Sequence, residues 1–203
     1  MALDLRPGER VYQEIKQAIL SGEFALLERL DIDRLASQLG VSATPVRYAL
    51  AILASERLVR VQASRTYHVV FWSERDLRAL YEFRQGLALW TADAYEPAPS
   101  TAAFVKNGSY VSAYLAVMKN LETSANPELR RAARAADDRL HAALRAEAEA
   151  LPDASSDLIR IAAALPKGGR PLKAALRKHF RRRIGQCASI RSAAHARAMP
   201  QDE

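Results

Sequence analysis

The sequence predicts a mainly α-helical protein in two parts: three short helices with a two-stranded hairpin, then an all-helical bundle. Three observations support this fold class. Apolar residues recur at helical spacing through most of the chain. Alanine is abundant while aromatics make up only 7%, a composition that favours helices over a β-sandwich. Runs typical of strands occur only between residues 58 and 71.

The first two helices are predicted from their apolar spacing and their end signals. Apolar residues at helical spacing in the segment 11–20 predict the first helix, which Ser21-Gly22 ends. Asp31 can cap the second helix at its N-terminus, because its side chain can accept a hydrogen bond from a free backbone N–H. Gly40 then stops this helix.

The third helix is predicted to begin after Ser42 as its cap. Pro45 is tolerated because it falls in the first turn, where backbone N–H groups lack partners within the helix. The expected buried stripe of this helix is Val46, Ala49, Leu50 and Leu53. Segments 58–62 and 67–71 are predicted to be two strands joined by a turn over 63–66.

A second domain is predicted to begin at Ser73, which can cap a helix that has an acid, Asp76, three residues later. We therefore divide the chain into residues 1–72 and residues 73–203. The second part contains no strand signal. Its helices are expected at 73–95, 109–124, 127–151, 155–165 and 171–195.

Charge and cysteine content limit the class of protein. The net charge is +7, and 49% of the residues are hydrophobic, as in ordinary globular domains. A single cysteine excludes an internal disulfide, and no apolar run reaches the ~20 residues of a membrane helix. We expect a cytoplasmic protein with a polyanionic partner and no membrane association. Residues 1–72 are nearly neutral, with nine basic and eight acidic side chains, so the excess lies in the second part.

Two short helices joined by a tight glycine turn and followed by a hairpin form a winged helix-turn-helix. The amino-acid residues of this segment identify the class of protein more specifically than the spacing of its elements does. Residues 11–24 and 35–50, the latter reading Leu-Ala-Ser-Gln-Leu-Gly-Val-Ser-Ala-Thr-Pro-Val-Arg-Tyr-Ala-Leu, resemble the GntR family of bacterial transcription regulators. The resemblance covers residues 9–71. It implies that the third helix enters the major groove of DNA and that the wing approaches the adjacent minor groove.

The candidate DNA-binding residues follow from this arrangement. Arg47 can donate two hydrogen bonds to guanine, and Tyr48 lies on the same exposed face. The hydroxyls of Ser42 and Thr44, beside the free N–H groups of the helix start, suit a phosphate. The remaining candidates are Arg34 on the second helix, for a phosphate or a base, and Arg65 at the wing tip, for the minor groove.

Two departures from the family pattern bear on specificity. The family usually has an arginine where Ala43 stands and a glycine where Thr66 stands. One arginine fewer removes about 1–3 kcal/mol of possible base discrimination. Arg34 can partly replace it, since many relatives carry an acid there. We therefore expect an operator that differs from the commonest family pattern.

The segment 73–84 resembles the start of the helical ligand-binding domain of the FadR-like, or FCD, branch of this family. The resemblance implies a metal that orients a small carboxylate effector, and a ligand set of two carboxylates and two imidazoles would suit Zn, Mn, Ni or Fe. Asp137 and His141 match the family's Asp-x-x-x-His element, and His179 matches its last histidine. The middle histidine is not found, and Asp157 stands at the corresponding interval. The stretch from His141 to His179 is shorter than in typical members, which places the pocket itself in question.

Two further basic features have open interpretations. Arg84 is a candidate to bind the carboxylate effector, with a structural ion pair as the alternative. The segment 160–197 carries eleven basic residues and no acid. It predicts a solvated helix face, a non-specific DNA clamp, an anionic-effector site or a dock for an acidic partner.

These observations predict a sequence-specific DNA-binding regulator, most simply a repressor and not an enzyme. It would bind a near-palindromic double-stranded operator as a homodimer and respond to a small organic acid. One alternative is a shortened regulator that senses no metabolite and acts through a protein partner. Another is a non-specific DNA-binding protein. A metal-dependent hydrolase would need a general base beside the metal, and no motif for one is found.

Overall fold

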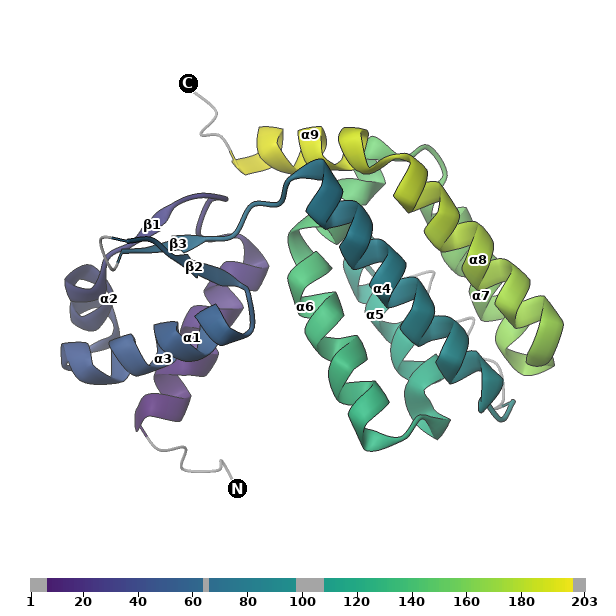
Figure 1. Ribbon diagram of the computed structural model, residues 1–203, viewed down its shortest axis with the longest axis horizontal. Coiled ribbons are helices and arrows are strands. Elements are labelled where there is room, and N and C mark those ends of the chain that lie inside the picture. The colour runs from purple at the N-terminus through teal and green to yellow at the C-terminus, as the bar shows by residue number, and fades with distance from the viewer. Residues whose placement is uncertain (1–6, 64–65, 98–107, 199–203) are drawn as a thin grey trace. The chain divides into compact units, whose positions relative to one another are not determined.

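The computed structural model describes residues 7–63, 66–97 and 108–198 (Figure 1). The chain divides into two compact units, one reaching up to Phe71 and one running from Trp72 to Arg197. This division lies beside Ser73, whose cap marks the start of the second predicted domain.

The first unit contains three helices, α1 (Pro7–Ser21), α2 (Ile32–Leu39) and α3 (Ala43–Ser55). As the sequence predicts, the Asp31 side chain caps α2, accepting a hydrogen bond from the backbone N–H of Arg34 at 2.9 Å. Gly40 ends α2 with a φ of 64°, a left-handed conformation that glycine adopts without steric cost. The helix-turn-helix is therefore set by local signals at both ends of α2.

The wing is a small antiparallel sheet of three strands in the order β1-β3-β2. The strands β2 (Val59–Val61) and β3 (Tyr67–Val69) are the two that the sequence predicts. The third, β1 (Arg29–Leu30), is an addition that two residues of sequence cannot signal. It pairs with β3 and thereby ties the segment before α2 to the wing. Leu30, Val59 and Val69 point from the sheet into the core formed with α1 and α3.

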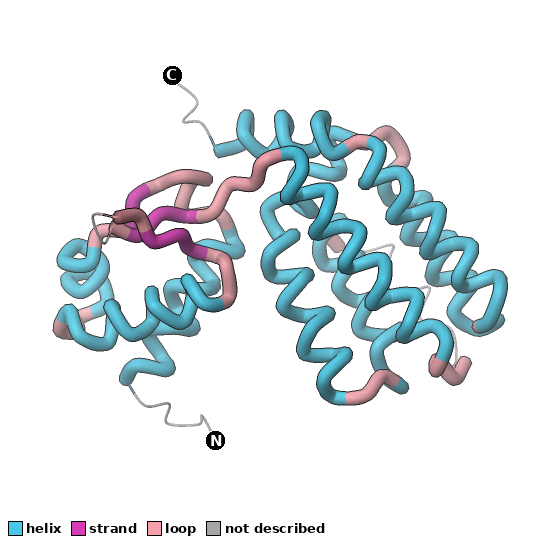
Figure 2. Tube along the Cα trace, viewed as in Figure 1, coloured by secondary structure: helices cyan, strands magenta, loops and turns pink. Residues whose placement is uncertain are grey.

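The second unit contains helices throughout its described residues, as the sequence predicts (Figure 2). They are α4 (Glu74–Asp93), α5 (Tyr110–Leu121), α6 (Pro127–Ala150), α7 (Ala154–Ala164), α8 (Gly169–Gly185) and α9 (Cys187–Ala198), with short 3-10 turns at Glu122–Ser124 and Leu165–Lys167. The helix predicted over 171–195 is in fact two, α8 and α9. The break falls at Gly185 and Gln186, where glycine has low helix propensity and Gln186 leaves helical geometry.

The helices of the second unit pack around α4, which contacts α5, α6 and α8. Its start is fixed by a full capping box, in which Ser73 and Asp76 satisfy each other's backbone N–H groups. Helix α7 packs between α5 and α8. The buried apolar stripe of α8 includes Leu172, Leu176 and Phe180. None of the described helices combines the length and the apolar character that a membrane span requires.

Candidate functional site

Helix α3 presents a polar face opposite a fully buried apolar one. Val46, Ala49 and Leu50 are completely inaccessible in the core of the first unit. Thr44, Arg47 and Tyr48 are exposed, and Tyr48 keeps 60% of its surface free. Because positions three and four apart share one side of a helix, these exposed side chains form a single face. The core therefore fixes this face, and its side chains remain available for a partner.

The N-terminus of α3 presents hydrogen-bond donors that can bind an anion. Ser42 occupies the cap position with extended backbone, but its hydroxyl makes no capping hydrogen bond, which differs from the predicted side-chain cap. The first backbone N–H groups of a helix have no partner within the helix and carry partial positive charge. An exposed Ser42 hydroxyl beside these groups and Thr44 can donate to a phosphate.

Arg34 lies on α2 with about half of its side chain exposed. Its Nη2 donates to Glu28 Oε1 at 3.1 Å, so this guanidinium already has a carboxylate partner. A surface pair of this kind contributes little stability and can exchange partners at low cost. Arg47, in contrast, makes no ion pair with any described residue. Arg65, the predicted wing-tip contact, lies outside the described residues.

The wing carries a basic row that the sequence prediction did not include. Arg29 on β1 and Arg60 on β2 are both directly opposite His68 on β3, so the three side chains lie across one face of the sheet. The His68 Nδ1 lies 3.1 Å from the carbonyl oxygen of Leu27, which assigns the N–H to that nitrogen. We call Arg29, His68 and Arg60 the wing row. The alternation of side chains along the two predicted strands is compatible with Arg60 and His68 on one face of the sheet. Arg29 could not be placed on that face from the sequence, because it lies on β1, a strand that the sequence did not predict.

Comparison with known proteins identifies this arrangement. Residues 7–69 match the family model described as bacterial regulatory proteins, gntR family. The N-terminal unit belongs to the GntR family. This GntR unit is 38% identical over 79 residues to an uncharacterized HTH-type transcriptional regulator, BphR, of Paraburkholderia xenovorans, covering 39% of this chain and 32% of that protein. It is 34% identical over 77 residues to the gluconate operon transcriptional repressor of Bacillus licheniformis, covering 38% of this chain and 31% of the repressor.

The chain thus spans about a third of the curated relatives that it matches. Solved structures extend the likeness of fold to the helical unit. The chain has a TM-score of 0.65 with E. coli McbR/YncC at 20% identity, covering 91% of this chain and 98% of that one. With a putative GntR regulator from Rhodococcus sp. RHA1 the TM-score is 0.64 at 17% identity, covering 97% and 99%. The likeness of fold therefore covers both the GntR unit and the helical unit that follows it.

The helical unit buries an arginine–carboxylate cluster at its centre. Arg84 on α4 is fully inaccessible, and its Nε and Nη2 donate to the two carboxylate oxygens of Asp137 at 2.7 and 3.0 Å. Nη2 also donates to Glu122 at 2.7 Å, and the Tyr114 hydroxyl donates to Asp137 at 2.9 Å. Burial alone would lower the pKa of Arg84, but Tyr114 and the two carboxylates raise it above its ordinary value.

This cluster bears on the predicted effector contact. Arg84 faces two acids, and burial raises the pKa of one of them, Glu122. An incoming carboxylate at Arg84 would have to compete with both carboxylates in a site without solvent. The contacts of Arg84 are those of the structural ion pair, which the sequence left open as the alternative.

A second buried arginine, Arg183 on α8, binds three further groups. Its Nε donates to Glu147 at 2.8 Å, its Nη1 to Asp157 at 2.7 Å and its Nη2 to the Tyr110 hydroxyl at 2.7 Å. Tyr81 donates to the other oxygen of Glu147 at 2.6 Å. These bonds connect α4, α5, α6, α7 and α8 through partners that lie 26 to 73 residues apart in the sequence. No local pattern identifies such a network.

Among the described residues, the four predicted metal ligands do not make up a metal-binding group. In the part of the chain that the structure describes, no group of three or more His, Cys, Asp or Glu side chains is arranged to hold a metal ion. Asp137 and Asp157 are buried and accept hydrogen bonds from arginines, and His141 is half-buried. The donors therefore do not fit the implied metal, and its presence stays a prediction from the resemblance.

His179 is buried against aromatic rings. It stacks on Tyr114 with a centroid distance of 5.9 Å and meets Phe180 edge-on at 4.9 Å. Neither ring nitrogen has a hydrogen-bond partner among the described residues. Burial, with the nearby Arg183 and Arg84, holds the pKa of His179 well below its usual range. This imidazole is therefore neutral at pH 7.

Proposed function

We propose that the chain is a sequence-specific DNA-binding transcription regulator that acts as a repressor. The observation that carries the proposal is the exposed face of α3, where Thr44, Arg47 and Tyr48 project from a helix anchored by a fully buried stripe. A helix presented in this way fits the major groove, where base edges can be distinguished. The gluconate operon repressor, a relative of this unit, supports the sign of regulation.

Individual roles follow from chemistry and position. Arg47 reads guanine, because an unpaired guanidinium can donate to its O6 and N7 at once. Ser42 and Thr44 hold a phosphate at the start of α3. The wing row contributes positive charge for further phosphates, which position the protein without reading sequence. Arg34 joins the interface when it exchanges Glu28 for DNA.

A homodimer is the second part of the proposal. A single α3 covers one half-site, and a two-fold dimer covers a near-palindromic operator with two. The exposed face of α4 supports a contact between copies, because Phe83 and Trp90 keep 50% and 65% of their surfaces free. They lie two helical turns apart, with Gly86 between them and open space beside it. In an antiparallel pair centred near Gly86, Phe83 packs against the partner's Trp90 and the reverse holds by symmetry.

The third part is a response to a small anion. A regulator of this design changes DNA affinity when an effector binds its helical unit. The basic excess of the second part supports an anionic effector, since its cations outnumber its acids.

Selection of bound sequences from random duplexes tests the proposal. The expected product is a near-palindromic motif with half-sites about one helical turn apart, bound at least 1,000-fold more tightly than random DNA at physiological salt. Equal affinity for the selected and random duplexes would instead support the non-specific alternative. Repeating the selection with candidate small acids and phosphates tests the effector part separately.

A further inference from the structure

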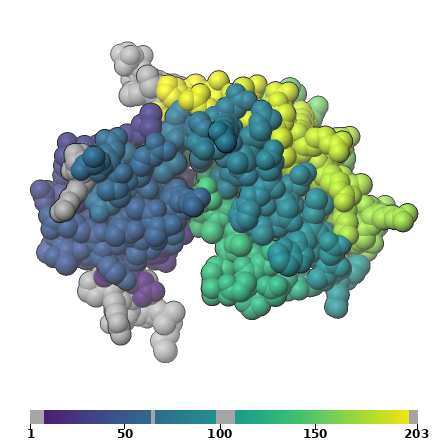
Figure 3. Space-filling view, viewed as in Figure 1, coloured from purple at the N-terminus to yellow at the C-terminus, as the bar shows by residue number. Residues whose placement is uncertain are grey.

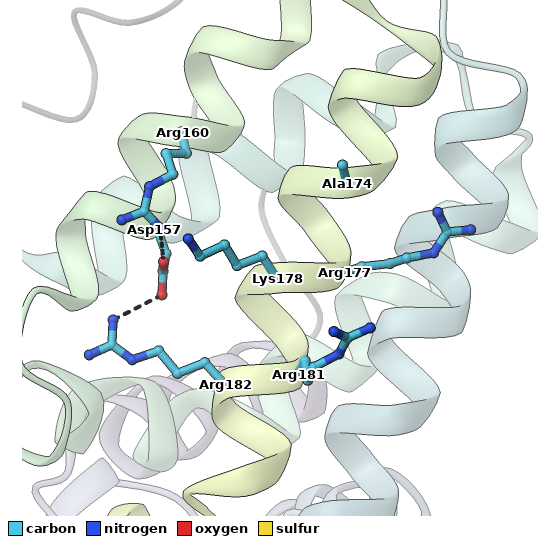
Figure 4. Close-up of a pocket in the computed structure, with 7 residues that line it drawn as sticks. All are labelled: Asp157, Arg160, Ala174, Arg177, Lys178, Arg181 and Arg182. Atoms are coloured by element: carbon cyan, nitrogen blue, oxygen red, sulfur yellow. Dashed lines mark hydrogen bonds and ion pairs between the residues drawn. The ribbon is translucent and has the colours of Figure 1, made fainter.

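Helices α7 and α8 line an open basic groove on the second unit. It has a volume of about 800 Å³, within the size range of small-molecule sites. Asp157 and Arg160 line it from α7, and the α8 lining is Ala174, Arg177, Lys178, Arg181 and Arg182 (Figure 4). The α8 surface is visible at one edge of the helical unit in Figure 3. We call this the α7–α8 groove.

The single acid of the groove is already shared among several cations. Asp157 is 2% exposed and accepts from Arg160 at 2.6 Å, from Arg182 at 3.4 Å and from the buried Arg183 at 2.7 Å. Arg182 also donates to the carbonyl of Pro152. The carboxylate therefore holds the α7 and α8 walls together but cannot neutralise the remaining charge.

Three cations of the groove have no partner among the described residues. Arg177, Lys178 and Arg181 make neither an ion pair nor a side-chain hydrogen bond there. In Figure 4 Lys178 extends from α8 toward Asp157 and Arg160, whereas Arg177 and Arg181 extend from the other side of α8. Like charges at this spacing repel one another, and a bound anion with several charges relieves that repulsion.

The α7–α8 groove is better suited to bind an anion than the surroundings of Arg84 are. Arg84 has two carboxylates and no exposed surface, whereas the groove has five cations for one carboxylate and opens to solvent. Arginine forks bind phosphate oxygens in pairs, and lysine adds a mobile point charge. The aliphatic stems of these side chains and Ala174 supply an apolar floor for the rest of a ligand.

We propose that the α7–α8 groove binds a small molecule carrying two or more phosphate groups. Several phosphates match its several unpaired cations better than one carboxylate does. Its concave shape and size favour a small molecule over the extended backbone of DNA. Calling this molecule an effector rests on the proposed function, but its binding to the full chain does not. Because Asp157 also binds Arg183, occupancy of the groove acts on the buried network of the helical unit.

Isothermal titration of the full chain at physiological salt tests this site. The probes are pyrophosphate, ATP and fructose 1,6-bisphosphate, which separate inorganic, nucleotide and sugar sources of the same chemistry. Inorganic phosphate and citrate serve as a single phosphate and a polycarboxylate. At least one polyphosphate should bind with a Kd at least tenfold lower than those of phosphate and citrate, and should raise the Tm.

The variant that tests the groove is Lys178→Gln with Arg181→Gln. Its matched control is Arg131→Gln with Arg134→Gln, which removes the same charge from exposed positions of α6. The groove variant should bind the polyphosphate at least tenfold more weakly, whereas the control should match the wild type. Equal losses in both variants, or no polyphosphate binding, would overturn the proposal. Binding of a random duplex that only the groove variant loses, without polyphosphate binding, would make the groove a DNA surface instead. Operator affinity measured alongside, without probe, reports on the proposed function independently.

Discussion

Arg84 and Asp137 form a two-pronged ion pair in the core of the helical unit, with Nε to Oδ1 at 2.7 Å and Nη2 to Oδ2 at 3.0 Å. Neither side chain is more than 7% exposed. A buried pair of this kind need not stabilise the fold more than apolar residues would, but removing one member leaves an uncompensated charge.

Arg84→Met is therefore expected to destabilise the protein by about 3–5 kcal/mol, because Asp137 and Glu122 lose their cation. The double variant Arg84→Met with Asp137→Leu should lose clearly less than the sum of the two single changes. Urea unfolding of all three variants measures both effects. Arg131→Met, which breaks the exposed pair with Glu128, is the control and should change stability by less than about 1 kcal/mol. Strictly additive losses would show that the two side chains do not act as a pair.

His179 is expected to make stability depend on pH below its ordinary pKa. The pKa of the folded state is lowered by burial, so the unfolded chain binds a proton first as the pH falls through about 6.5. The unfolding free energy should then fall by about 1.4 kcal/mol per pH unit from this residue until the folded state also takes up the proton. Above pH 7, His179 no longer makes the unfolding free energy depend on pH. His179→Phe should lose less stability than the wild type between pH 7.5 and 5.5, and parallel losses would contradict the burial of a neutral ring.

The wing row should act on DNA without reading its sequence. Arg29→Ala and Arg60→Ala are each expected to weaken binding of selected and random duplexes by a similar factor. Each should also lower the dependence of log affinity on log salt by about one, as the loss of one phosphate contact predicts. Anisotropy titrations at several salt concentrations measure both. A loss confined to the selected sequence would assign the row to base recognition instead.

The exposed face of α4 should control association. Phe83→Ser with Trp90→Ser is expected to raise the dimer Kd at least tenfold, since both aromatics lose their packing against the partner. Ile159→Ser, at an exposed apolar position on α7, is the matched control and should leave it unchanged. Sedimentation velocity over a concentration series provides the measurement. An unchanged dimer in the double variant would place the interface elsewhere.

Sequence reasoning predicted the elements that local chemistry determines. Asp31 marks the start of α2 and Gly40 marks its end. Both could be predicted, because a side-chain cap and a left-handed glycine are properties of single positions. The strand β1 could not be predicted, because two residues carry no periodicity and their pairing depends on the distant β3. Hydrogen-bond and ion-pair partners that lie far apart in the sequence could not be predicted either.

The candidate site residues also fall into two groups: those that local spacing predicts and those whose surroundings depend on distant partners. The exposed position of Arg47 on α3 follows from helical spacing alone and was predicted. Asp137, in contrast, is bound by Arg84, which lies 53 residues away, so no spacing rule connects them. The same limit applies to Asp157, which the resemblance suggested as a metal ligand and which the fold places beside Arg183.

The most direct test of the account is the operator affinity of Arg47→Ala, measured by gel shift beside the wild type. The control is Arg131→Ala, which removes an equal charge from an exposed position on the helical unit. We predict that Arg47→Ala reduces the preference for operator over random DNA by at least tenfold while its Tm and circular dichroism stay unchanged, and that Arg131→Ala behaves as the wild type. Wild-type operator affinity and preference in Arg47→Ala would contradict the claim that this face of α3 reads DNA.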